Sequence, residues 1–107
     1  MRMGIRSFAA SVALLSMFSV GSFAQSPGAA TYKSKCQMCH GASGMADTGA
    51  GKSMGVKPVS DPDVKKMTQA EMVALTKDGK GKMPSFKDKL TDAQIKAVVD
   101  YYISLAK

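Results

Sequence analysis

The chain has 107 residues, enough for one small domain, and its fifteen basic and eight acidic residues give a net charge of +7. Lysines without interleaved aromatic side chains argue against binding of nucleic acids, which uses rings for base stacking. The positive charge favours either transient docking on acidic protein surfaces or simple solubility.

Residues 1–24 have the three parts of a secretory signal peptide. Arg2 and Arg6 precede an apolar run that closes on Ser22 and Ala24, the small residues that signal peptidase prefers. The run is shorter than the ~20 residues of a membrane-spanning helix, so we expect cleavage after Ala24, export to the periplasm and no stable membrane insertion of the remaining chain. Loss of both arginines leaves thirteen lysines against eight acidic residues, a net charge of +5 on a single domain of residues 25–107.

Two of three predicted helices lie before residue 80. The first covers residues 27–38, because Ser26 can cap it and Pro27 suits the first helical position. The second covers residues 68–78, because Thr68 begins a Thr-Gln-Ala-Glu capping box and an Asp-Gly pair follows the last apolar residues.

The third predicted helix covers residues 91–105. It begins with a second capping box, Thr-Asp-Ala-Gln, and its apolar residues recur at helical spacing. No alternation typical of strands occurs, so the fold class is predicted to be all-α. Residues 41–67 are rich in glycine and show no sustained period, which predicts a long loop that needs something to pack on, such as a cofactor.

Two patterns in this loop imitate ligand-binding motifs. Residues 49–53, Gly-Ala-Gly-Lys-Ser, end like a phosphate-binding loop but lack its first glycine and the preceding strand. Asp61-Pro62-Asp63 lacks the glycine and the terminal glutamate of a calcium loop, and we interpret it as a turn.

The motif Cys36-Gln37-Met38-Cys39-His40 is C-x-x-C-H, the signature of covalent haem c attachment. On a helical turn the thiols of Cys36 and Cys39 can reach the two vinyl groups of one porphyrin and form thioethers. His40 then presents its imidazole to the iron. One haem c with its iron is therefore the predicted cofactor.

Three other interpretations of this motif lack support. A disulfide that closes two intervening residues constrains little chain entropy, and a redox-active dithiol would need a βαβ context. A zinc site needs four ligands, whereas Cys36, Cys39 and His40 are the only cysteines and histidine in the chain.

Since His40 is the only histidine, the second axial ligand would be methionine, lysine, water or an exogenous molecule. The methionine candidates are Met38, Met45, Met54, Met67, Met72 and Met83. We predict Met83, because it lies in a glycine-rich segment between two helices and Pro84 stiffens that loop. Met67 and Met72 lie beside or on a helix and are expected to fill the core, while the two methionines of the long loop remain alternatives.

These features resemble the class I c-type cytochromes of bacteria, small exported monohaem electron carriers with an early C-x-x-C-H and a later Met-Pro. The resemblance covers residues 27–107 and implies a fold in which N- and C-terminal helices cross, with a short middle helix and long loops around a covalent haem. It also implies a backbone carbonyl, at Pro58 or a neighbour, that accepts the Nδ1 proton of His40.

The resemblance assigns the helix crossing to a small residue and an aromatic residue before the first cysteine. These are Gly28 and Tyr32 in this chain. Their counterparts on the last helix are expected near Val98 and at Tyr101 or Tyr102, a register that the Tyr-Tyr pair leaves open by one residue.

The expected function is one-electron transfer at positive potential by a monomeric carrier that is not an enzyme. Histidine and methionine keep iron six-coordinate, and methionine favours Fe(II). Lysines that could surround the haem edge and dock on acidic redox partners are Lys35, Lys80, Lys82 and Lys87. The alternatives are an open-site haem protein that binds a small ligand and, least favoured, a thiol-disulfide oxidoreductase.

Overall fold

The computed structural model describes residues 26–107, so the predicted signal peptide lies outside the described residues. The helical segments are α1 (Pro27–Thr31), η1 (Tyr32–Cys36), α2 (Gln37–His40), α3 (Gly49–Ser53), α4 (Pro62–Lys65), α5 (Gln69–Asp78) and α6 (Asp92–Ser104). The only β interaction among residues 26–107 is an isolated bridge between Lys80 and Met83. The predicted all-α fold class is confirmed.

The first three segments form one continuous helical run. Pro27 occupies the first turn, and the backbone stays right-handed helical where α1 passes into η1 and η1 into α2. The run is longer than the predicted helix over 27–38, because it ends at His40, where Gly41 takes a φ of 80°. Its middle turn is a π-helix, which the sequence pattern did not predict. The extension brings Cys39 and His40 onto the helix.

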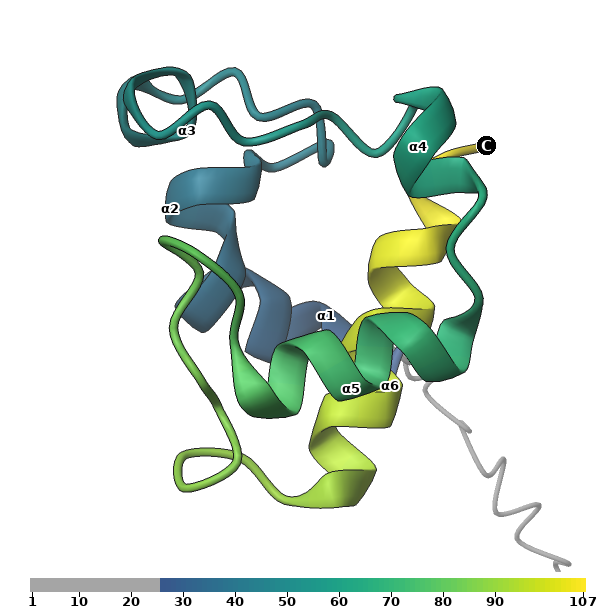
Figure 1. Cartoon of the computed structure of the whole chain (residues 1–107). Helices are drawn as coiled ribbons and strands as arrows, with labels where there is room; N and C mark the ends of the chain where they lie inside the picture. The colour runs from purple at the N-terminus through teal and green to yellow at the C-terminus, as the bar shows by residue number, and fades with distance from the viewer. Residues whose placement is uncertain (1–25) are drawn as a thin grey trace, which may run out of the picture.

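The helix α1 crosses α6 at a glycine (Figure 1). A Cβ atom on Gly28 would lie 2.1 Å from the carbonyl oxygen of Ala97 and 2.7 Å from the Cα of Val98. One turn later Tyr32 packs on both tyrosines of α6, with ring centroids 5.2 Å from Tyr101 and 6.2 Å from Tyr102. The expected crossing is confirmed, and the open register is resolved because both tyrosines take part.

The helix α5 lies beside α6 and completes the core. Met72 of α5 is buried against Ile95 and Val99 of α6. Both helices begin at the predicted threonine caps: Thr68 accepts from the backbone N–H of Glu71 at 3.1 Å. The capping box of α6 has both of its hydrogen bonds. The caps explain why these two helices start where the sequence predicts.

The expectation of an irregular loop over 41–67 is wrong in two places. The side chain of Thr48 caps α3. Asp61 caps α4 by accepting from the N–H of Asp63 at 2.8 Å, with Pro62 in the first helical turn. The segment Asp61-Pro62-Asp63 is therefore a helix start rather than a turn. Figure 1 shows α3 at the end of the molecule where α2 lies and α4 near the C-terminal end of α6.

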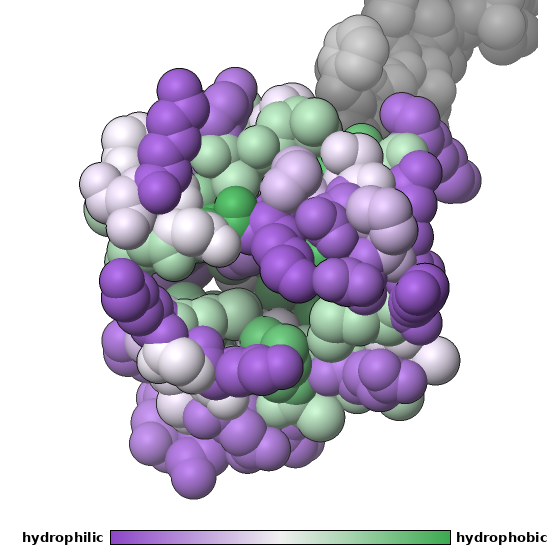
Figure 2. Space-filling view, turned by 45° about the horizontal axis from the view of Figure 1, so that its top comes forward, coloured by the Kyte–Doolittle hydropathy of each residue, from purple (hydrophilic) through white to green (hydrophobic). Residues whose placement is uncertain are grey.

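Within residues 26–107 no helix has the length and apolar character needed to cross a membrane. Figure 2 shows hydrophilic side chains over much of one face and hydrophobic side chains around a hollow near its centre.

Candidate functional site

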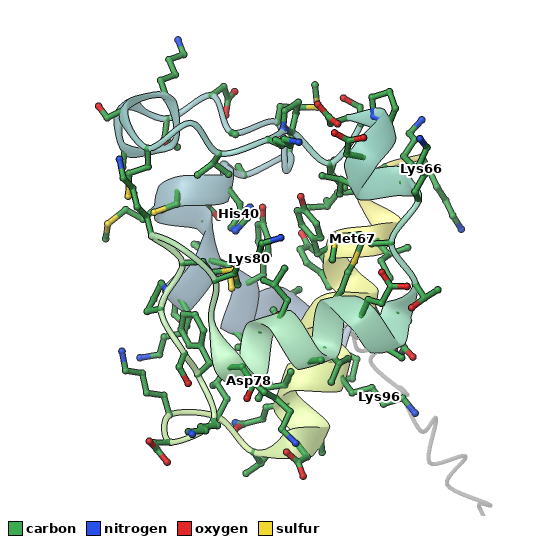
Figure 3. The ribbon with its side chains drawn as sticks, viewed as in Figure 1. His40, Lys66, Met67, Asp78, Lys80 and Lys96 are labelled. Carbon is green, nitrogen blue, oxygen red and sulfur yellow. The ribbon has the colours of Figure 1, made fainter. Side chains whose placement is uncertain are left out.

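The helical run α1–η1–α2 ends with the three residues of the predicted haem motif. Cys36 is the last residue of η1, and Cys39 and His40 are the last two residues of α2. Both thiols are free and half-buried. Figure 3 shows the imidazole of His40 pointing from α2 toward the middle of the molecule. Two free thiols and an imidazole thus share one end of a helix.

The short helix α3 holds the backbone of this motif. The hydroxyl of Thr48 donates to the carbonyl of Met38 at 2.6 Å and accepts from the N–H of Gly51 at 2.9 Å. A Cβ on Gly51 would lie 2.3 Å from the carbonyl oxygen of Cys39, so the position requires glycine. This role of Thr48 was not predicted from the sequence, where its one sign was a threonine that could cap a helix beginning at Gly49.

Burial determines the protonation of the motif. The pKa of His40 is lowered by desolvation, which favours the neutral imidazole, the form that ligates metals. The pKa of Cys36 is raised to about 11 by desolvation and, secondarily, by the neighbouring Cys39. Dithiol oxidoreductases lower the pKa of the attacking thiol. The raised pKa of Cys36 argues against that chemistry.

The Nδ1 atom of His40 is buried and has no hydrogen-bond partner among residues 26–107. The expected acceptor was the carbonyl of Pro58 or of a neighbour. In the structure, the carbonyl of Pro58 accepts a hydrogen bond from the N–H of Asp61 at 2.9 Å. The contact that His40 does make is aromatic: its ring centroid lies 5.3 Å from that of Tyr102, with the planes at 66°. Tyr102 was expected only as a possible partner in the helix crossing, and nothing in the sequence indicated its contact with His40.

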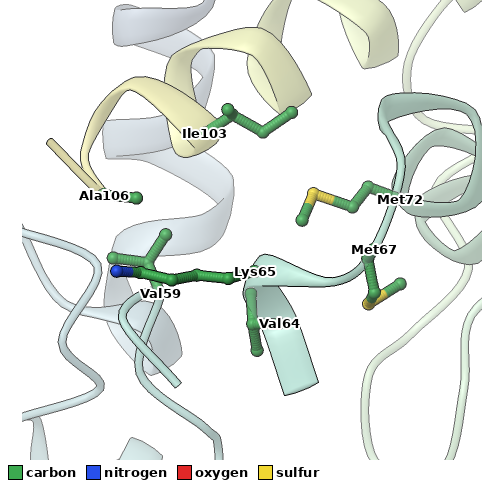
Figure 4. A pocket seen from close by; sticks show the side chains of 7 residues that line it. All are labelled: Val59, Val64, Lys65, Met67, Met72, Ile103 and Ala106. Carbon is green, nitrogen blue, oxygen red and sulfur yellow. The ribbon is translucent and has the colours of Figure 1, made fainter. Parts of the chain in front are cut away.

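The structure separates the candidate methionines by exposure. The side chains of Met38 and Met45 are 77% and 45% exposed. Met67 and Met72 line an apolar cavity of about 130 Å³, shared with Val59 and other residues from α4 and α6 (Figure 4). These two behave as the predicted core fillers.

Met83 lies half-buried on the loop between α5 and α6. A tight turn fixes its backbone: the N–H of Lys80 donates to the carbonyl of Met83 at 3.1 Å, and the N–H of Met83 donates to the carbonyl of Lys80 at 3.0 Å. Gly79 and Gly81 enable the turn, with φ values of 77° and 57°.

A structural zinc site has no support in the described part of the chain, because residues 26–107 contain no cluster of three or more metal-ligating His, Cys, Asp or Glu side chains. The residues present fit a haem instead. Two free half-buried thiols can form thioethers, a neutral imidazole can ligate iron, and hydrophobic side chains border the hollow of Figure 2.

Comparisons with known proteins agree with this chemistry. Residues 23–101 match the family described as cytochrome C oxidase, cbb3-type, subunit III. A solved structure, the KustC0563 c-type cytochrome, is similar with a TM-score of 0.68 and 28% sequence identity, over 75% of this chain and 98% of that one. No curated protein matches the chain.

The match over most of the chain implies covalently bound haem c with its iron, and electron transfer with redox partner proteins. Cytochrome c domains of this family transfer electrons, which is consistent with the expectation that the chain is not an enzyme. The chain belongs to the cbb3-type subunit III family of cytochrome c domains, and it is a class I c-type cytochrome.

Proposed function

We propose that residues 25–107 form a soluble, exported electron carrier with a single haem c. Cys36 and Cys39 would form the thioethers, and His40 and Met83 would ligate the iron. One observation carries the proposal: two free, half-buried thiols and a half-buried imidazole, whose pKa is lowered by desolvation, end the same helical run.

When bound, haem supplies the one-electron couple between Fe(III) and Fe(II). His40 contributes a neutral nitrogen ligand on a backbone that α3 holds in place. Met83 contributes a weakly donating thioether, and a methionine ligand raises the reduction potential. Val59, Met72 and Ile103 line a mainly apolar cavity, and apolar surroundings of a haem would disfavour the extra charge of Fe(III). We expect a positive potential.

The assignment of Met83 as a ligand rests on the exposure and position of the other candidate methionines. Two are exposed and two line the cavity, while Met83 is half-buried on a loop shaped by two glycines of positive φ. Met54, at the end of α3, remains the other half-buried loop methionine.

Replacement of the ligand tests this choice. Met83→Ala is expected to abolish the weak red absorption band of the ferric protein and to open the iron to carbon monoxide in the ferrous protein. Met67→Leu is the control, because leucine preserves the apolar volume of a core position, and it should retain the band. Retention of the band in Met83→Ala would reject Met83, and Met54→Ala would then be the next variant.

The lysines expected to dock on partners are available for that role. Lys35, Lys80, Lys82 and Lys87 are all exposed. The two ion pairs among residues 26–107 use other lysines, Lys57 with Asp63 and Lys77 with Asp92. Exposed positive charges of this kind would speed association with acidic partners, and salt would screen this effect. Electron-transfer rates with the partner should therefore fall as ionic strength rises, and rates independent of salt would contradict the docking proposal.

Export is proposed from the three-part pattern of residues 1–24. Mass spectrometry of the periplasmic protein should give a chain that begins at Gln25 and carries one haem. A mass that includes residues 1–24 would contradict cleavage.

The first experiment on the function is a visible spectrum of the oxidised and reduced protein, with and without carbon monoxide. An electron carrier should show sharp low-spin bands that survive acid-acetone extraction and do not respond to carbon monoxide. A response to carbon monoxide would indicate the open-site alternative. Absence of haem absorption would favour the alternative in which Cys36 and Cys39 act as a thiol-disulfide oxidoreductase.

A further inference from the structure

The orientation of the His40 ring is not set by a hydrogen bond among the described residues. A histidine that ligates a metal almost always donates its second ring N–H to a carbonyl or carboxylate, which fixes the ring. Here Nδ1 of His40 is buried without such a partner among residues 26–107. A contact of another kind can therefore contribute to limiting rotation of the ring.

The contact that can do so comes from Tyr102 on α6. Its ring lies 5.3 Å from the imidazole of His40, centroid to centroid, at an interplanar angle of 66°. This edge-to-face arrangement is one of the two that aromatic pairs prefer, and rotation of the imidazole would disturb it.

Tyr102 is itself held in place from two sides. It packs against the buried cluster of Met72, Ile95 and Val99. It also stacks on Tyr32, with centroids 6.2 Å apart and planes at 25°. Its ring therefore has little freedom to follow a movement of His40.

Tyr32, on which Tyr102 stacks, also contacts the backbone next to His40. Tyr32 is 2% exposed, and its hydroxyl donates to the carbonyl of Gly41 at 2.6 Å. Gly41 is the residue directly after His40. Tyr32 thus fixes the backbone beside His40, while Tyr102, stacked on the same Tyr32, contacts the His40 ring.

We propose that Tyr102 is a positioning residue whose ring sets the orientation of the His40 imidazole. The proposal rests on the proposed function, in which His40 ligates the iron. The orientation of an axial imidazole determines how its π orbitals overlap with the iron d orbitals. The g values of the low-spin ferric protein report that overlap directly, so a spectroscopic test is possible without measuring electron transfer.

The chain provides a matched control in the neighbouring tyrosine. Tyr101 lies 5.2 Å from Tyr32, on the same helix, but its ring is not paired with His40. A role confined to packing on Tyr32 would make Tyr101 and Tyr102 equivalent. A positioning role separates them.

The experiment compares electron paramagnetic resonance spectra of four purified haem-loaded proteins: the wild type, Tyr102→Phe, Tyr102→Leu and Tyr101→Leu. We expect Tyr102→Leu to shift the g values, since leucine keeps apolar volume but removes the ring. Tyr102→Phe and Tyr101→Leu should retain the wild-type values. Unchanged g values in Tyr102→Leu, or an equal shift in Tyr101→Leu, would overturn the proposal. An equal shift in Tyr102→Phe would assign the effect to the hydroxyl and overturn it as well.

A second measurement needs no variant, in case Tyr102→Leu does not fold. In the diamagnetic reduced protein, nuclear Overhauser contacts are expected between the ring protons of Tyr102 and those of His40. Their absence would overturn the proposal. A wild type without covalent haem would reject the proposed function, whereas a low-spin wild type with unaltered Tyr102→Leu spectra would reject only the positioning role.

Discussion

Two regions of the molecule are stabilised in different ways. Where α1 crosses α6, the two backbones touch at Gly28, which has no room for a Cβ. Buried side chains surround this contact: Tyr32, Val98 and Ile95 are at most 3% exposed. Residues 41–67 contain one large buried side chain, Val59, and are otherwise held by backbone hydrogen bonds and helix caps. The first region is specified by its own packing, while the second is tied to the backbone of the haem motif through Thr48 and Gly51.

The largest expected loss of stability comes from a substitution that disrupts the crossing of α1 with α6. In Gly28→Ala the added methyl group would overlap the backbone of α6 at Ala97 and Val98, which cannot move aside as a flexible side chain can. We expect a loss of about 3 kcal/mol in the free energy of unfolding, measured by guanidinium denaturation of the haem-loaded protein.

A matched glycine controls for the substitution itself. A Cβ on Gly49 would meet nothing within 4 Å, and Gly49 starts a helix. Gly49→Ala should therefore leave the free energy of unfolding within about 0.5 kcal/mol of the wild type. Equal losses in Gly28→Ala and Gly49→Ala would refute the close crossing.

A smaller effect is expected where the second region meets the haem motif. In Gly51→Ala the new methyl group would press on the carbonyl oxygens of Cys39 and Ala46, 2.3 and 2.9 Å from the ideal Cβ position. The segment has few packed side chains and can shift, so we expect about 2 kcal/mol of destabilisation. Amide hydrogen exchange should rise first in residues 41–67 and not in α6. Equal acceleration in α6 would show that the two regions unfold as one unit.

The difference between the regions also explains what the sequence could predict. The starts of α5 and α6 were predictable, because Thr68 and Thr91 cap long helices with apolar spacing. The helices α3 and α4 were missed because four or five residues are too few to show a period. Their caps were nevertheless visible, as a threonine before Gly49 and as the Asp61-Pro62 pair.

The site was predictable where its spacing is local. The positions of Cys36, Cys39 and His40 follow from a five-residue motif. The contact of His40 with Tyr102 joins residues 62 positions apart in the sequence, and no local pattern encodes it. The expected acceptor at Pro58 came from resemblance, and the observed partner of its carbonyl is Asp61.

Alkaline pH should weaken the crossing through its tyrosines. Burial raises the pKa of Tyr102 to about 12 and that of Tyr32 further, mainly by desolvation, from an ordinary value near 10. The unfolded chain therefore releases these protons at lower pH than the folded chain. The resulting stability is fully present below pH ~10 and is lost as the pH rises toward the folded pKa values.

Denaturation midpoints at pH 9 and pH 11 measure this loss. In Tyr32→Phe the decline should be shallower, because one of the two buried hydroxyls is gone. At pH 7 the same variant should be about 1 kcal/mol less stable than the wild type, because the carbonyl of Gly41 loses its donor. An unaltered pH dependence would contradict the burial of Tyr32 in solution.

The smallest expected effect lies on the surface of the second region. Lys57 and Asp63 form an ion pair at 2.8 Å, but their side chains are 57% and 67% exposed. The pair lowers the pKa of Asp63 chiefly through its hydrogen bond with Lys57, so its contribution would be present at neutral pH and lost on acidification. Solvent exposure screens such pairs, and Asp63→Asn should leave the denaturation midpoint at pH 7 unchanged.

The cap of α4 provides the comparison for this surface pair. Asp61→Ala, which removes the cap, should lower the free energy of unfolding by about 1 kcal/mol. A larger loss in Asp63→Asn than in Asp61→Ala would mean that charge pairing, and not capping, holds α4 in the second region.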